Sequence, residues 1–146
     1  MEKIKAQNFK NHARLVPAFH FFVLPVFLIN LIYALVRLKD GVTFFSVWNA
    51  VLAFTLFLFA GLARTFALTV QDRVIRLEMQ IRLERLLVPE LRPRIGEFTV
   101  NQLVGLRFAG DDELPVLALQ VLNENLTSRK IIKQRVKDWR PDFLRA

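Results

Sequence analysis

The pattern of hydrophobic and polar positions divides the chain into two long apolar runs and a more polar C-terminal half. PAFHFFVLPVFLINLIYALV (17–36) carries no formally charged side chain, and neither does VTFFSVWNAVLAFTLFLFAGLA (42–63). A helix of about 20 residues is roughly 30 Å long, which is the thickness of the hydrocarbon core of a bilayer. Because only RLKDG (37–41) separates the runs, the pattern predicts an antiparallel transmembrane helical hairpin over residues 17–63.

Two other interpretations of the apolar runs are less favoured. The N-terminal cations resemble the positive n-region of an export signal: Lys3, Lys5, Lys10 and Arg14. However, the first run is longer than an h-region of about 7–15 residues, and no small-residue cleavage pattern follows it. A hairpin buried in a soluble core would need more apolar cover than the rest of the chain offers.

The second run has no helix-stop signal at its inner end. No proline occurs before Pro89, and residues 64–87 are rich in good helix formers. Charged pairs at i,i+4 in the favourable acid-first order are Asp72/Arg76 and Glu78/Arg82. We therefore predict one helix from about Val42 to about Val88, in which residues 64–88 project from the membrane as a cytoplasmic stalk.

One stripe of small and then apolar residues runs along this predicted helix. It consists of Ser46, Ala50, Ala53, Ala60, Gly61, Ala63 and Ala67, followed by Val70, Val74, Leu77 and Ile81. Small residues let helices approach closely in lipid, and apolar residues at heptad spacing bury a seam in water. In one interpretation the small part receives the first span and the seam packs on the C-terminal domain. In the other, both parts join copies of the chain in a homo-oligomer.

Proline and glycine end the stalk and begin a helical C-terminal domain, residues 89–146. The predicted segments are 99–109 with Thr99 as N-cap, 111–126, and 127–139 with Ile132, Val136, Trp139 and Phe143 on one face. The acidic cluster GDDEL (110–114) lacks the spaced oxygens of a calcium loop. We interpret it as a cap, because carboxylates suit a helix N-terminus.

The charge distribution suggests an orientation and a class of partner. Cations concentrate in the tail (1–16) and after the second span, whereas the loop carries Arg37 and Lys39 beside Asp40. By the positive-inside rule, both termini lie in the cytoplasm. The net charge of +8 favours anionic partners. Candidate contacts to anionic lipid are Lys10, Arg14, Arg129, Lys130, Lys133 and Lys137. For residues 127–139 a merely solvated basic face is the first interpretation, lipid contact the second and nucleic acid the least favoured.

The polar side chains inside the spans favour structural roles. No Asp, Glu, Lys or Arg lies at mid-depth, so a proton relay has little to work with. We predict that Asn30 and Asn49 hydrogen-bond each other as a hairpin latch, with pore lining as the alternative. His20 is interpreted as an interfacial residue, and Pro25 as a kink with local backbone adjustment.

The composition argues against most catalytic and cofactor chemistry. The chain has no Cys and two His, which excludes thiolate chemistry and disfavours a multi-ligand metal centre. Fourteen Phe against one Tyr fit side chains that face lipid tails. We predict that the protein is not an enzyme and binds no cofactor or metal.

Four stretches carry a resemblance to a known group of proteins: QNFKNHARLVPAFHFF, ALTVQDRVIRLEMQIRL, LRFAGDDELP and WRPDFLRA. In this order they resemble a family of small two-span bacterial membrane proteins of unknown function, over nearly the whole chain. The resemblance implies a bacterial inner-membrane setting and a two-span layout. It implies no activity and no catalytic residue.

These observations combine into an all-α integral membrane protein with a tail, a transmembrane hairpin, a stalk and a basic C-terminal domain. Its predicted role is a homo-oligomeric scaffold or an accessory subunit of a larger membrane complex. The alternatives are a small oligomeric channel lined by Ser46, Asn49 and Ala53, and a membrane-tethered nucleic-acid binder. At the inner face of the membrane we also predict contacts among NFKNH (8–12), the stalk and WRPDF (139–143).

Overall fold

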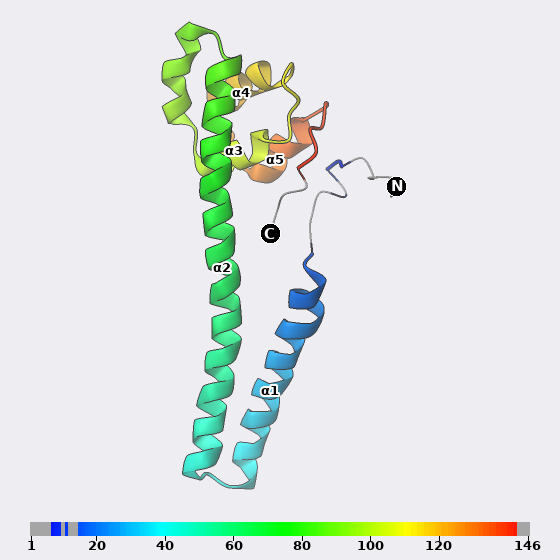
Figure 1. The fold of residues 1–146 in the computed structure, drawn as a ribbon, viewed down its shortest axis with the longest axis vertical. Coiled ribbons are helices and arrows are strands. Elements are labelled where there is room, and N and C mark those ends of the chain that lie inside the picture. The colour runs from blue at the N-terminus through cyan, green and yellow to red at the C-terminus, as the bar shows by residue number, and fades with distance from the viewer. Residues whose placement is uncertain (1–6, 10, 12–14, 143–146) are drawn as a thin grey trace. The chain divides into compact units, whose positions relative to one another are not determined.

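The computed structural model describes residues 7–9, 11 and 15–142, and the regular elements among these residues are helices (Figure 1). The chain divides into two compact units. We call Arg14–Thr69 the apolar unit, and Met1–Ala13 together with Val70–Arg145 the helical domain. The long helix α2 (Phe44–Leu86) contributes to both, in close agreement with the single helix predicted from about Val42 to about Val88.

The apolar unit begins with a π-helical turn that Pro25 explains. The turn η1 (Ala18–Val23) leads into α1 (Leu24–Arg37), and the backbone N–H of Leu24 donates to the carbonyl of Phe19, five residues back. Proline has no N–H to donate, and its ring collides with the carbonyl four residues before it. A wider turn removes that collision, so the predicted adjustment at Pro25 takes the form of a π-helix.

The loop between α1 and α2 is closed by local hydrogen bonds. It contains the short helix η2 (Leu38–Asp40) and Gly41, whose φ of 148° favours glycine. Ser46 N–H donates to Thr43 Oγ1 at 3.1 Å, and Thr43 N–H donates to Ser46 Oγ at 2.8 Å. These reciprocal bonds satisfy backbone donors at the start of α2. Ser46 is therefore a capping residue, and its predicted place in the helix-packing stripe stays a prediction.

Helices α1 and α2 touch through small side chains near the loop. Ala34 of α1 packs with Ala50 and Ala53 of α2, and Leu31 and Leu38 pack against this cluster. Alanine lets two helix backbones approach closely. The structure thus gives Ala50 and Ala53 to the contact with the first apolar helix.

The predicted latch between Asn30 and Asn49 is not formed. Both residues are exposed, and the hydrogen bonds of the described residues include none between them. The reason is that the interhelical contact is made by the alanine cluster, with both amides outside it.

The rest of the small stripe does not share one environment. Ala60 is buried, whereas Gly61, Ala63 and Ala67 are exposed. The apolar unit therefore does not pack through one continuous small-residue surface along α2.

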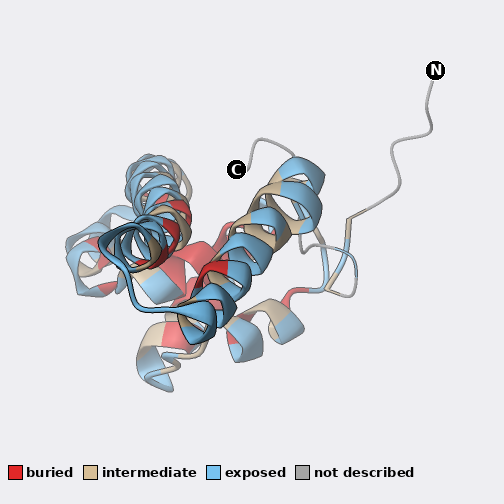
Figure 2. Cartoon of the chain, turned by 90° about the horizontal axis from the view of Figure 1, so that it is seen from below, coloured by how far each residue is buried: buried red, intermediate tan, exposed pale blue. Residues whose placement is uncertain are grey.

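Two helical stretches are long and apolar enough to cross a membrane: Ala18–Asp40 and Phe44–Leu86. In their most apolar windows only 6% and 11% of the residues are buried. Phe21, Phe45 and Phe59 are among the exposed large apolar side chains, and Figure 2 shows exposed surface along both long helices. This differs from the core helix of a soluble protein, which is mostly buried.

The helical domain packs four short helices and the end of α2 around one core. The short helices are η3 (Pro89–Glu97), α3 (Val100–Leu106), α4 (Leu114–Asn123) and α5 (Arg129–Arg135). The core includes Ile75, Met79 and Leu83 of α2 and Leu87 directly after it, with Leu103, Leu106, Phe108, Leu114, Val121 and Ile132. Helices were predicted in all three segments of this region, and Thr99 makes the predicted N-cap through a capping box with Gln102. Ile132 and Val136 are buried as predicted, while Phe143 lies outside the described residues.

The face of α2 that enters this core is not the predicted one. The buried stripe follows i,i+4 spacing through Ile75, Met79, Leu83 and Leu87. The predicted seam is exposed: Val70 by 60%, Val74 by 48%, Leu77 by 61% and Ile81 by 52%. At about 100° per residue, the two stripes lie about 180° apart on the helix. The interpretation that the seam packs on the C-terminal domain is therefore wrong.

Helices α3 and α5 approach so closely that glycine is needed at the contact. A Cβ atom on Gly105 would lie 2.8 Å from Cγ2 of the buried Ile132. That separation is too short for two carbon atoms, and the Ile132 side chain has no solvent to move into.

We expect Gly105→Ala to lower the free energy of unfolding by roughly 1–3 kcal/mol, because the added methyl group overpacks a filled core. Thermal unfolding of the full chain in detergent micelles, followed by circular dichroism, measures the effect. Gly96→Ala is the matched control, since nothing lies within 4 Å of its added Cβ. A Gly105→Ala protein as stable as the Gly96→Ala protein would contradict the contact.

Candidate functional site

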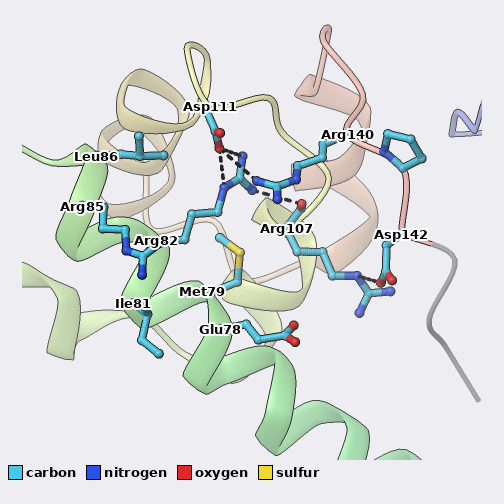
Figure 3. A pocket seen from close by; sticks show the side chains of 11 residues that line it. Glu78, Met79, Ile81, Arg82, Arg85, Leu86, Arg107, Asp111, Arg140 and Asp142 are labelled. Atoms are coloured by element: carbon cyan, nitrogen blue, oxygen red, sulfur yellow. Dashed lines mark hydrogen bonds and ion pairs between the residues drawn. The ribbon is translucent and has the colours of Figure 1, made fainter.

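An open cavity of about 840 Å³ lies in the helical domain, between α2 and the segments around residues 107–111 and 140–142 (Figure 3). Its lining is unusually charged. The arginines are Arg82, Arg85, Arg107 and Arg140, and the carboxylates are Glu78, Asp111 and Asp142. Figure 3 shows Arg82 and Arg140 pointing toward Asp111, and Arg107 toward Asp142.

Arg82 of α2 is the centre of this arrangement. Its Nε donates to Asp111 Oδ1 at 2.7 Å, its Nη2 to the carbonyl of Ala109 at 2.6 Å, and its Nη1 to the carbonyl of Arg107 at 3.2 Å. The side chain is only 13% exposed. One planar guanidinium thus ties α2 to three points of the segment that follows α3, which an ammonium group could not match.

Asp111 joins two arginines from distant parts of the chain. Arg140 Nη1 donates to the same Oδ1 at 3.1 Å. The hydrogen bond from Arg82 is the main reason that the pKa of Asp111 lies below its ordinary value of 3.8, with the charges of Arg82 and Arg140 adding to it. Glu78 is left without Arg82, its predicted i,i+4 partner, because Arg82 turns into the domain.

The acidic cluster 111–113 is therefore not a helix cap as predicted. Glu113 has no side-chain capping bond to α4. Its carboxylate instead accepts the backbone N–H groups of Lys137 at 2.9 Å and Asp138 at 2.8 Å. The carboxylates serve tertiary contacts because the C-terminal segment presents unpaired backbone donors there.

The C-terminal segment lies against the residues after α3 as an isolated antiparallel bridge between Ala109 and Trp139. Gly110 N–H donates to the carbonyl of Asp138, and Arg140 N–H to that of Phe108, each at 2.8 Å. A Cβ atom on Gly110 would overlap the Asp138 carboxylate, which is exposed and would have to turn aside.

Arg107 and two aromatic rings form the other edge of the cavity. Arg107 Nε lies 3.2 Å from Asp142 Oδ2, and its guanidinium carbon lies 4.5 Å from the centre of the Phe108 ring. The ring centroids of Phe108 and Trp139 are 4.9 Å apart. Lys133 also lies over the Phe108 ring, with its Nζ 5.1 Å from the centroid, so this predicted lipid contact is engaged inside the domain.

The N-terminal tail reaches the same place. Asp142 N–H donates to Gln7 Oε1 at 2.8 Å, and Gln7 Nε2 donates to the carbonyl of Asp142 at 3.3 Å. Gln7 directly precedes NFKNH but is not part of it, so the predicted contact of residues 8–12 with WRPDF stays a prediction. Lys10 and His12 of that stretch lie outside the described residues.

The other predicted lipid contacts are distributed differently. Arg129 pairs with Asp72 of α2 at 2.8 Å and donates to Asn101 at 2.6 Å, so it too is engaged in contacts within the helical domain. Asp72 was predicted to pair with Arg76. Lys130 and Lys137 are exposed. Arg14 lies outside the described residues, as does Lys10.

The ion pairs of Arg82 and Arg140 with Asp111, and of Arg107 with Asp142, join the segments that line the cavity, and we call this set the charged clamp. Three of the four cavity arginines contact carboxylates. Among the described residues, no group of three or more His, Cys, Asp or Glu side chains gathers as metal ligands would. His20, in the apolar unit, places Nδ1 3.2 Å from the backbone nitrogen and 2.9 Å from the carbonyl oxygen of Val16, a local contact at the start of its helix.

Replacing Arg82 with alanine leaves the carbonyls of Arg107 and Ala109 without their donor. We expect this change to lower the free energy of unfolding by roughly 1–3 kcal/mol. Thermal unfolding of the full chain in micelles measures it, with Arg85→Ala as the control. Arg85 lies on the same helix and lines the same cavity, but it is exposed and has no ion pair among the described residues. Equal Tm values for the two variants would refute the clamp.

The lowered pKa of Asp111 predicts that the free energy of unfolding decreases at acidic pH. Its pKa is lower in the folded chain, so its stabilisation is fully present above 3.8 and is lost as the pH falls through the folded pKa below that value. We expect Asp111→Asn to be less stable at pH 7 and to lose less stability than the natural chain below pH 4. Parallel slopes of Tm against pH for the two proteins would count against this linkage. The slopes come from unfolding curves recorded between neutral and acidic pH.

Comparison with known proteins identifies a family but no described relative. The model of a family of unknown function, DUF6526, matches residues 1–146, and the chain therefore belongs to this family. No curated protein and no solved structure matches the chain.

Proposed function

We propose that this member of the DUF6526 family is a non-enzymatic integral membrane protein that assembles as a homo-oligomeric scaffold. In this proposal its two apolar helices form a transmembrane hairpin in a bacterial inner membrane. Its helical domain lies in the cytoplasm, and the cytoplasmic part of α2 joins copies of the chain.

The membrane part of the proposal rests on length, exposure and charge. Both apolar stretches are long enough to span a bilayer, and their side chains are mostly exposed. The exposed side chains are too apolar and too numerous for water to be their natural solvent. The cations of the tail and of the stretch after the second span favour a cytoplasmic position for both termini.

The observation that carries the scaffold is the exposed apolar seam on the domain part of α2. The domain's own core covers the opposite face of the helix, so the seam is not needed for folding of this chain. Four apolar side chains at spacings of four, three and four remain 48–61% exposed. Heptad spacing of this kind is typical of a surface that receives another helix.

The other readings have less support from particular residues. A pore stripe of Ser46, Asn49 and Ala53 is divided, because Ser46 caps α2 and Ala53 packs against α1. For nucleic-acid binding, two of the candidate cations are already engaged within the domain, because Arg129 is paired with Asp72 and Lys133 lies over the Phe108 ring. An accessory subunit uses the same seam for a foreign helix, and the experiment below separates it from a homo-oligomer.

The test is the mass of the intact complex extracted in mild detergent. We expect a homo-oligomer that Leu77→Asp dissociates to monomers, because a carboxylate cannot be buried in the seam without cost. Val116→Asp is the matched control. Val116 is exposed by 61%, the same fraction as Leu77, but lies on α4 away from the seam.

Three outcomes decide the proposal. A homo-oligomer that is lost in Leu77→Asp and retained in Val116→Asp supports it. Stoichiometric foreign subunits that leave with Leu77→Asp would replace it with the accessory role. A monomer that carries no partner would overturn both roles.

A further inference from the structure

We infer that the partner on the exposed seam is a second copy bound in parallel and in register, with Arg73 of each copy against the partner's Glu78. The inference rests on the proposed homo-oligomer and adds its direction, register and charge contacts. It is argued from the heptad positions of the seam and its flanking residues on α2, and from the ion pairs that other residues of α2 form within the helical domain.

The seam defines a heptad register. Val74 and Ile81 occupy a positions, and Val70 and Leu77 occupy d positions, at spacings of four, three and four. β-Branched residues at a with leucine at d favour two strands. Glu84 occupies the next d position, so the apolar seam ends one turn after Ile81. In the other direction the same spacing continues in the sequence through Ala67 and Ala63, both exposed.

The flanking positions distinguish parallel from antiparallel pairing. In this register Arg73 is a g residue and Glu78 is the e residue five positions later. In a parallel pair, g of one helix lies beside e of the next heptad on the partner, so arginine meets glutamate twice across the two-fold axis. In an antiparallel pair, g faces g and e faces e, and these two residues do not meet. The following g and e positions, Gln80 and Arg85, put no like charges together in the parallel arrangement.

Contacts inside the domain explain why these two charges are available. Arg82 is the i,i+4 neighbour of Glu78, but it is held by Asp111 at 2.7 Å. The ion pairs of the described residues include neither Arg73 nor Glu78. Both residues are exposed beside the seam. Their charges complement each other across a dimer and have no equivalent contact among the described residues of one chain.

The membrane enforces the same direction. Two copies of one protein inserted with the same topology keep their α2 helices parallel, and a two-fold axis along the membrane normal then relates them. The helix direction that the membrane topology requires is therefore the same as the direction that the flanking charges favour, although the two arguments use different residues.

Disulfide formation tests direction and register. The natural chain has no Cys, so each engineered thiol reports on its own site only. We expect Leu77→Cys to form a disulfide-linked dimer on mild oxidation in native membranes, because equal d residues meet in a parallel pair. Arg76→Cys is the control, since Arg76 directly precedes Leu77 but occupies a c position, which faces away from the seam. Equal cross-linking of both variants, or none at residue 77, would overturn the inference.

A charge exchange tests the predicted ion pair. We expect Arg73→Glu and Glu78→Arg each to weaken self-association roughly tenfold, because two attractions become two repulsions. The doubly exchanged chain should recover most of the loss. Self-association is measured by energy transfer between labelled chains diluted in micelles. A double variant as weak as either single one would overturn the pairing.

The two proposals fail in different ways. A chain that is monomeric by mass in mild detergent removes the homo-oligomer and, with it, the register. A homo-oligomer by mass that Leu77→Asp dissociates, but that neither cross-links at residue 77 nor recovers on charge exchange, removes only the parallel register. Residues 73, 77 and 78 are exposed, so we expect these substitutions to leave the helices intact. Circular dichroism of each variant checks this.

Discussion

The hydrogen bonds of Arg82 are the interaction on which the helical domain depends most. A largely buried guanidinium binds one carboxylate and two backbone carbonyls, and each of these acceptors would be costly to leave unpaired. The two carbonyls fix the path of the chain after α3. Asp111 then brings in Arg140, so that one side chain of α2 indirectly positions the C-terminal segment as well. With Arg82 turned inward, Ile75, Met79, Leu83 and Leu87 enter the core.

Features decided by neighbouring residues could be predicted from the sequence. The long helix α2 follows from an uninterrupted run of helix formers, and the Thr99 cap from a motif that closes over three residues. Pro25 predicted a local adjustment because its missing N–H acts within one turn. The existence of α3, α4 and α5 was also predictable, whereas η3 forms over the Pro89–Glu97 stretch that was predicted only to end the stalk.

Features decided by distant residues were missed, and charged residues show why. The spacing of Asp72 with Arg76 and of Glu78 with Arg82 is ideal for intrahelical pairs, which contribute only about 0.2–0.5 kcal/mol each. A partner on another element competes successfully with so weak a pair, and Asp72 and Arg82 indeed pair with Arg129 and Asp111. The GDDEL cluster was misassigned for the same reason. No pattern within ten residues reveals that Glu113 will receive backbone donors from Lys137 and Asp138.

The choice of face on α2 has the same physical origin and determines what the helix can do next. Both apolar stripes of its domain part have helical spacing, and hydrophobicity alone does not say which one belongs to the core. The polar contacts break this symmetry: Asp72 and Arg82 lie toward the domain, and their partners fix the helix rotation. The remaining stripe keeps its heptad spacing and stays in solvent, at a cost of about 25 cal/mol for each Å² of apolar surface. The chain satisfies its own core with one face of α2 and retains a second, regular apolar face, and the proposed homo-oligomer rests on this second face.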